Sequence, residues 1–163
     1  MNDKIYTPQH VANFILRKEK KLNRSITQLK LLKLVYLLYG WVLAVLDRKL
    51  FDEPIKGGVY GPVILSLYHE FKRFGSKPII GYSVEINENN GEIIIPNIPE
   101  NEQKLLLVME KAWATYSFFT AIALVSKTHE PDNPWAKCKH HEFIVDKNIK
   151  KYFVKKIQEY LNE

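Results

Sequence analysis

The chain has 163 residues, 46% of them hydrophobic, and its 24 Lys and Arg outnumber 18 Asp and Glu to give a net charge of +6. A chain of about 150 residues buries roughly 70% of its unfolded surface, so this length and composition favour a globular fold over disorder and predict a single domain, residues 1–163. The single cysteine, Cys138, excludes an internal disulfide and favours a reducing compartment.

Neither secretion nor membrane insertion is indicated. The first ten residues lack the basic start and apolar core of a signal peptide. The longest uncharged apolar run, residues 34–46, is shorter than the stretch of about 20 residues that a membrane span needs. We therefore expect a cytoplasmic protein without a membrane partner, in which this run forms a buried helix.

Two helices are predicted in the first third of the chain. Thr7 followed by Pro8 is typical of an N-cap and the first helical residue. Ser25 and Gln28 have the spacing of a capping box and predict a second helix over about 26–46. Apart from Lys30 and Lys33, this second helix is apolar on all sides, so other elements must enclose it.

The sequence then predicts a long connection, a third helix and a hairpin. Gly61 and Pro62 have the pattern of a helix cap and first residue, and apolar residues follow at helical spacing. Alternating residues on both sides of Asn90-Gly91 predict a β-hairpin over about 82–96.

The last third is predicted to be helical again. Pro99 is expected to start one helix, Ser117 to cap a second, and Asp146 to cap a terminal one. Two prolines in the segment THEPDNPW predict an extended stretch from which Trp135 packs back on the body. The expected fold is mainly α, a compact helical domain around the buried helix 26–46 with one small β-hairpin. Gly40 in that central helix is expected to mark the close approach of a neighbour.

Basic residues are concentrated in one stretch, since residues 17–33 carry seven Lys or Arg and one Glu. Such a patch favours nucleic acid or an acidic protein as a partner, although a solvated helix end has the same composition. A helix-turn-helix would have to use helix 26–46 for recognition, and its apolar circumference leaves few side chains to read base edges.

Catalytic and metal-binding patterns are weak. The sequence has no G-x-S-x-G and no phosphate-binding loop. Cys138 near His140 and His141 suggests a thiolate–imidazole pair, and His129 could join them around zinc, but the spacing fits neither site well. The adjacent carboxylates Asp52 and Glu53 diverge. We expect no enzyme, no cofactor and no metal.

Several motifs occur together in a characteristic order. They are TQLKLLKLVYLLYGW (27–41), LFDEPI (50–55), Y-G-P-V-x(4)-Y (60–68), F-x(3)-G (71–75) and T-H-x(4)-P-W (128–135). With this order and spacing the chain resembles the Panacea antitoxin domain, a family that includes SocA-like and phage-associated GepA-like proteins.

The resemblance implies a mostly helical, non-enzymatic domain that acts as the antitoxin of a bacterial or phage toxin–antitoxin module. It would bind a cognate toxin directly and block it. Two alternatives stay open: an adaptor that delivers a bound toxin to a cytoplasmic protease, and a nucleic-acid-binding regulator. The oligomeric state is not predicted.

The resemblance and the exposed-loop chemistry together define a candidate partner-binding surface. Its residues are Lys30, Lys33, Tyr60, Gly61, Pro62, Val63, Tyr68, His129, Pro134 and Trp135. The resemblance implies that Tyr60 to Val63 lie beside His129 and Trp135. Tyrosine and tryptophan in such loops favour a binding surface because they offer large contact areas with few rotors. Replacing Lys30 and Lys33 with Glu is expected to weaken binding without unfolding.

Overall fold

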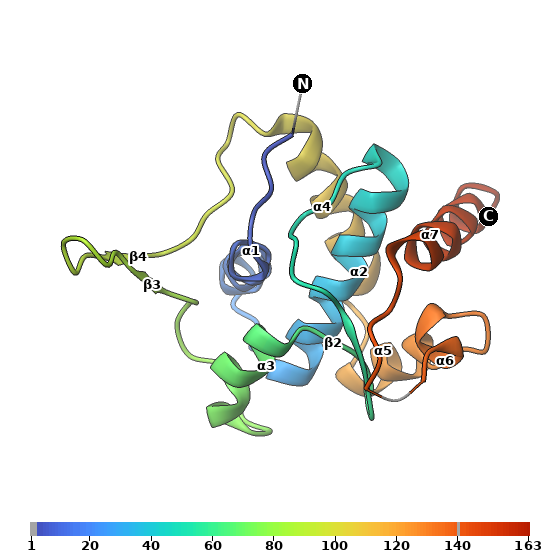
Figure 1. The fold of residues 1–163 in the computed structure, drawn as a ribbon, viewed down its shortest axis with the longest axis horizontal. Coiled ribbons are helices and arrows are strands. Elements are labelled where there is room, and N and C mark those ends of the chain that lie inside the picture. The colour runs from blue at the N-terminus through green and yellow to red at the C-terminus, as the bar shows by residue number, and fades with distance from the viewer. Residues whose placement is uncertain (1–2, 140) are drawn as a thin grey trace.

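The computed structural model describes residues 3–139 and 141–163 of a mainly α-helical fold (Figure 1). The helices are α1 (Pro8–Lys21), α2 (Gln28–Leu46), α3 (Leu65–Phe71), the 3-10 helix η1 (Lys72–Phe74), α4 (Gln103–Tyr116), α5 (Ala121–Thr128), α6 (Pro134–Lys137) and α7 (Asp146–Leu161). Two antiparallel pairs join β1 (Lys56–Gly58) to β2 (Gly61–Val63) and β3 (Glu85–Ile86) to β4 (Ile93–Ile94). The predicted fold class is confirmed.

Helix α2 occupies the centre of the fold. Every residue from 31 to 43 is buried, and α1, α3, α4, α5, α7 and β2 all pack against this helix (Figure 1). An apolar circumference has to be covered on all sides, and this arrangement covers it. The predicted central helix over about 26–46 is therefore confirmed.

The same helix has the length and apolarity of a membrane span. Among the described residues, α2 alone passes this test, with 19 residues and a mean hydropathy of 1.8. In the structure, 72% of that window is buried by the surrounding elements. The apolar residues of α2 thus form the interior of the fold.

Gly40 allows the terminal helix to approach α2 closely. A Cβ atom at Gly40 would lie 2.1 Å from two ring carbons of Phe153 on α7. The Phe153 ring also meets Tyr36 edge-on at a centroid distance of 5.6 Å. The prediction that Gly40 marks close packing is confirmed, and the neighbour is α7.

The start of α2 differs from the prediction. The N-cap is Thr27, whose hydroxyl accepts a hydrogen bond from the Lys30 backbone at 3.4 Å, whereas Ser25 is exposed and does not cap the helix. Ile26 is buried and its carbonyl accepts from Ile79 N at 2.9 Å. This contact keeps the chain extended through Ile26, so the helix begins later than the capping-box spacing indicates.

Pro62 does not begin a helix, which corrects the sequence prediction. Residues 61–63 form β2 and pair with β1, with Lys56 opposite Val63 and Gly58 opposite Gly61. Gly61 has a φ of +108°, a backbone conformation available to glycine rather than to a helix cap. Helix α3 starts only at Leu65, and the predicted long connection contains a second, unpredicted hairpin.

Three other helix starts are shifted. Helix α4 begins at Gln103 rather than Pro99. Ser117 ends α4, donating its backbone N–H to Trp113 O at 2.8 Å, and the hydroxyl of Thr120 caps α5 instead. Asp146 is the first residue of α7, one position after the cap.

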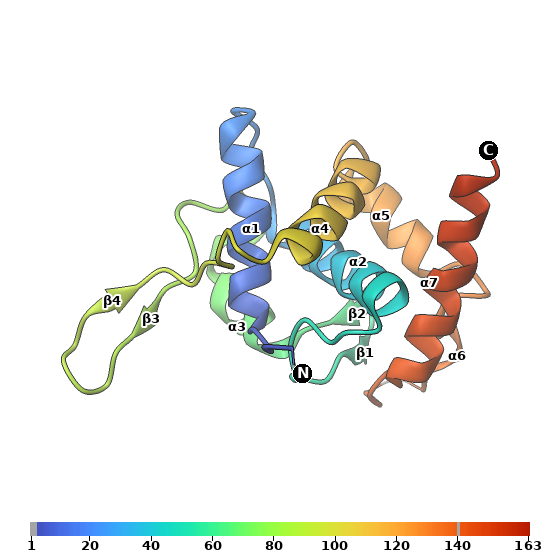
Figure 2. The same cartoon turned by 90° about the horizontal axis from the view of Figure 1, so that it is seen from above.

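The predicted hairpin over about 82–96 is present and projects away from the helical body (Figures 1 and 2). We refer to residues 83–96 as the arm. Both of its ends are held by Asn13 of α1, which is fully buried. The Asn13 amide donates to Ser83 O at 3.0 Å and to Pro96 O at 2.9 Å, and its carbonyl oxygen accepts from Ser83 N at 2.8 Å.

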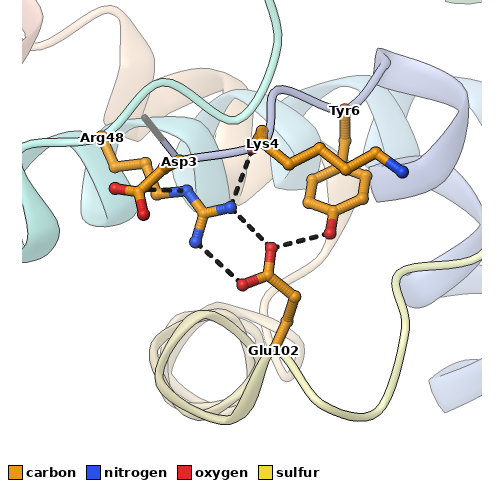
Figure 3. A network of polar contacts seen from close by, with 5 residues as sticks. All are labelled: Asp3, Lys4, Tyr6, Arg48 and Glu102. Carbon is orange, nitrogen blue, oxygen red and sulfur yellow. Dashed lines mark hydrogen bonds and ion pairs between the residues drawn. The ribbon is translucent and has the colours of Figure 1, made fainter. Parts of the chain in front are cut away.

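A polar network ties the N-terminal segment to α4 and to the connection after α2 (Figure 3). Arg48 donates two hydrogen bonds to the carboxylate of Glu102, at 2.6 and 3.2 Å, and one to Lys4 O at 2.8 Å. Tyr6 donates to the same carboxylate at 2.7 Å. The Arg48 hydrogen bonds hold the pKa of Glu102 below its usual value, while burial and then the Glu102 hydrogen bond raise the pKa of Tyr6 to about 12.

Replacing Gly40 with Ala is expected to destabilise the protein by about 1–3 kcal/mol, because the new methyl group overlaps the Phe153 ring. The expected loss appears although Ala is about 1 kcal/mol better than Gly in a helix interior. Urea denaturation of both proteins measures the difference. In the Phe153→Leu background, Gly40→Ala should cost less stability than it does in the wild-type chain. An equal loss in both backgrounds would contradict the proposed overlap.

Candidate partner-binding surface

The β1–β2 hairpin presents two exposed side chains on a buried base. Val59 and Tyr60 form the two-residue turn between Gly58 and Gly61, and their side chains are 63% and 69% exposed. Gly61 and Pro62 on the same hairpin are buried. Within the Y-G-P-V motif, therefore, Tyr60 faces solvent, whereas the buried Gly61 and Pro62 form the base of the turn.

The base of this hairpin packs tightly on α2 and α5. A Cβ atom at Gly61 would lie 2.8 Å from Thr128 Oγ1 and 3.2 Å from Lys33 Nζ. Lys33 donates a hydrogen bond to Pro62 O at 3.1 Å. The glycine of the motif is thus required both by its positive φ and by this close approach.

Lys33 is an interior residue, only 3% exposed. Burial lowers the pKa of its ammonium group to about 8 from 10.5, and no ion pair with a carboxylate accompanies it in the described parts of the chain. The expectation that Lys33 belongs to a surface patch is wrong. A Glu at this position would bury an unpaired carboxylate, so the predicted tolerance of Lys33→Glu is also withdrawn.

The T-H-x(4)-P-W motif supports the other strand of the hairpin. Trp135 Nε1 donates to Gly58 O at 2.7 Å, and the Trp135 ring lies 3.9 Å from the His129 ring, centroid to centroid, at 45°. Pro134 is buried as the first residue of α6. These contacts place His129 and Trp135 next to the hairpin that carries Tyr60.

Asn133 joins this surface to α2, a contact that the sequence analysis did not predict. Its side-chain oxygen accepts from Trp135 N at 3.1 Å, which caps α6, and from the hydroxyl of Tyr36 on α2 at 3.3 Å. Asn immediately before Pro is the sequence signal for such a cap. We name the assembly of Val59, Tyr60, Gly61, Lys33, Thr128, His129, Asn133 and Trp135 the hairpin platform.

Burial, followed by the nearby Lys33 charge, lowers the pKa of His129. A neutral imidazole packed on the Trp135 indole therefore forms part of the platform's support. The His129 ring lies at the C-terminal end of α5 and packs on Trp135 of α6, the residue that bonds β1.

Two residues of the predicted surface lie apart from the platform. Lys30 donates to Ser117 O at 2.7 Å, where it satisfies a carbonyl at the end of α4, and burial lowers its pKa. Tyr68 on α3 is 42% exposed and packs edge-on against His69 at 5.4 Å. Any binding role of these two residues stays a prediction.

The basic stretch 17–33 presents less free charge than its composition suggests. Lys18 pairs with Glu110 at 2.7 Å and Arg24 with the buried Glu19 at 2.9 Å, while Lys30 and Lys33 serve the contacts given above. The three remaining cations, Arg17, Lys20 and Lys21, are exposed at the end of α1. The cationic surface is thus a cluster at this helix end.

The thiol and histidine alternatives receive no support. Burial, and next Glu142, raise the pKa of Cys138, whereas a nucleophilic thiol needs a lowered one. His140 lies outside the described residues. Among residues 3–139 and 141–163, no group of three or more His, Cys, Asp or Glu side chains is placed to hold a metal ion.

The fold and this surface define a class of protein: a small helical domain that presents an exposed two-residue turn, one aliphatic and one aromatic, on a hydrogen-bonded base. The sequence profile of the family described as "Antitoxin SocA-like, Panacea domain" matches residues 31–136. The chain belongs to this family. The match spans Lys33, the β1–β2 hairpin and Trp135.

One curated relative is similar over most of the chain. Antitoxin SocA of Caulobacter vibrioides (strain NA1000 / CB15N) is 30% identical over 125 residues, which are 77% of this chain and 66% of that protein. The chain therefore aligns with just under two thirds of its relative's length. No solved structure matches. Family membership supports an antitoxin role.

Replacing Lys33 with Met is expected to stabilise the protein near neutral pH, since a buried charge is removed at the cost of one hydrogen bond. The folded-state pKa of about 8 lies below the unfolded value of 10.5, so the unfolded wild-type chain binds more protons between these values. Wild-type stability relative to Lys33→Met should accordingly rise with pH across this window, by at most about 1.4 kcal/mol per pH unit.

Urea titrations of both proteins at several pH values measure this difference, with Lys30→Met as the matched control. Lys30 is less buried than Lys33 and should show a weaker pH dependence. A wild-type-minus-Met difference that is constant from pH 7 to pH 10.5 would contradict the buried-charge interpretation.

Proposed function

We propose that this chain is the antitoxin of a toxin–antitoxin module and that it neutralises its cognate toxin by direct binding through the hairpin platform. Membership of the SocA-like antitoxin family supports the role. The observation that carries the proposed site is the exposed pair Val59 and Tyr60 on a buried, hydrogen-bonded base.

The platform has the properties of a binding anchor. The backbone on both sides of Tyr60 is held before any partner binds. Trp135 of α6 donates to Gly58 O of β1, and Lys33 of α2 donates to Pro62 O of β2. A preorganised backbone loses little conformational freedom on binding, so more of the contact energy of the side chain that it carries appears as affinity. A large ring at the tip of a fixed turn suits a pocket or cleft on the toxin.

The proposed mechanism is stoichiometric. The antitoxin would cover the toxin's active site or hold it in an inactive conformation, and no chemical step is required of the antitoxin. Three polar side chains of the platform each donate to a backbone carbonyl: Lys33 to Pro62 O, Trp135 to Gly58 O and Thr128 to Val125 O. Side chains engaged in this way support a surface better than they supply a nucleophile or general base.

Lys21, exposed at the end of α1, adds an electrostatic component to this proposal. Its charge would accelerate encounter with a toxin whose contact surface is acidic, and the effect should weaken with salt.

Co-expression with the product of the neighbouring gene tests the proposed function. Growth arrest by the neighbour alone, rescue by this chain and co-purification of the two would support it. A harmless neighbour, or rescue without a complex, would contradict direct neutralisation. Toxin turnover that needs both this chain and a protease would favour the adaptor alternative. DNA binding that depends on sequence and weakens with salt would favour the regulator alternative.

Tyr60→Ala is expected to weaken toxin binding by about 2 kcal/mol or more, because an anchor side chain is lost from the centre of the contact. Stability should change little, since Tyr60 is 69% exposed. Binding is measured by titration calorimetry on the purified pair. Leu161→Ala is the matched control: Leu161 is 80% exposed at the end of α7, away from β1 and β2 (Figure 2). Equal affinity of the two variants would remove Tyr60 from the interface.

A further inference from the structure

The arm is anchored to the helical body at its root, but its two strands do not pack on the helices. Its two ends are fixed by the buried Asn13, and Ser83 Oγ also donates to Glu70 at 2.9 Å. Beyond this root, the two strands extend away from the helices (Figures 1 and 2). An isolated two-stranded hairpin is marginally stable in water, so a fixed root with an uncovered ribbon indicates that another surface completes it.

One face of the ribbon is uniformly apolar. Ile86 lies opposite Ile93, and extending this register by one residue places Val84 opposite Ile95 on the same face. The exposed fractions of these four side chains are 49% for Val84, 68% for Ile86, 71% for Ile93 and 43% for Ile95. A contiguous patch of β-branched residues at this exposure is typical of an interaction site.

The charges of the arm are all negative and lie mostly toward its tip. Residues 83–97 contain Glu85, Glu88 and Glu92 and no Lys or Arg, in a chain whose net charge is +6. Glu88 and Glu92 flank the turn, where Asn87 N donates to Glu92 O at 2.8 Å. The tip therefore favours a basic surface.

Besides Glu70, which accepts from Ser83, the root of the arm carries two cations. Arg17 and Lys20 of α1 stand over the Tyr82 ring, at 5.2 and 5.5 Å from its centroid. Neither cation has an ion pair within the described ranges of the chain, so both charges are free to meet a carboxylate from outside. Lys20 and Tyr82 also line a groove of ≈ 440 Å³ together with Leu16, Arg24 and Ile79.

Tip and root are thus complementary, and they lie at opposite ends of an apolar ribbon. The separation from Tyr82 to Glu88 is roughly 20 Å at the rise of a β-strand. A two-fold axis perpendicular to the strands, lying between two ribbons at the middle of their length, would place the two arms antiparallel with their apolar faces in contact. It would also bring each acidic tip to the basic root and groove of the other copy.

We propose that the arm is a dimerisation element whose partner is the arm and root of a second copy of this chain. The contact is isologous: Ile86 and Ile93 pack near the axis, and Glu88 and Glu92 pair with Arg17 and Lys20 of the second copy. The parallel alternative sets acidic tip against acidic tip, which costs energy, so the charges also select the antiparallel arrangement.

Sedimentation equilibrium of the purified chain tests this proposal. The wild-type protein is expected at twice the chain mass of 19.1 kDa. The variant Ile86→Lys/Ile93→Lys should sediment as a monomer. Leu107→Lys, at a 57% exposed position on α4, is the matched control and should leave the dimer unchanged.

Charge reversal tests the antiparallel arrangement. Glu88→Lys/Glu92→Lys and Arg17→Glu/Lys20→Glu should each raise the dimer dissociation constant roughly tenfold or more, and salt should weaken the wild-type dimer. Combining all four substitutions in one chain should restore the dimer, a rescue that misfolded variants would not show.

Two results would overturn the proposal. The first is a wild-type monomer at the highest soluble concentration, and the second is a dimer that Ile86→Lys/Ile93→Lys leaves intact. If the wild-type chain is a monomer and its arm variants also lose the neighbouring gene product, the arm belongs to the toxin contact instead. Antitoxin activity of the wild-type chain is scored separately, so failure here leaves the proposed function standing.

Discussion

The enclosure of α2 is the constraint on which the rest of the structure depends. A helix with an apolar surface on every side is stable only when other elements remove that surface from water, so α1, α4, α5 and α7 have to surround it. Close packing around α2 also restricts single positions. Position 40 has to be glycine because Phe153 of α7 lies against the helix backbone there.

The hairpin platform is built on the same helix, and this links stability to the proposed binding site. Lys33 of α2 reaches Pro62 of β2, and Tyr36, one turn further along, reaches Asn133. Burying a lysine without a carboxylate partner among the described residues costs stability, and Lys33 lies within the residues that match the family profile. The strands on both sides of the exposed turn are therefore hydrogen-bonded to side chains whose own positions depend on the packing around α2.

Much of the fold was predictable because it rests on local patterns. The apolar run of α2, the Thr7-Pro8 start of α1 and the Asn90-Gly91 turn each confine the backbone within a few residues. Predictions failed where a distant contact outweighs a local preference. The segment around Pro62 is a strand because it pairs with residues 56–58, and Ser25 does not cap α2 because Ile26 is bound to Ile79. Nothing in the local sequence distinguishes Asn13, yet it holds both ends of the arm.

By itself, the sequence determined a mainly α-helical domain around one buried helix, one hairpin, and membership of an antitoxin family through motif order, because each of these depends on spacing along the chain. Only the tertiary structure decided which motif residues face solvent. Lys33 is interior, Lys30 serves the end of α4 and Tyr60 is exposed. The same holds for the opposite charges at the two ends of the arm. Exposure and charge pairing are set by which segments meet in space, and residues as distant as Asn13 and Pro96 carry no mark of their contact in the sequence.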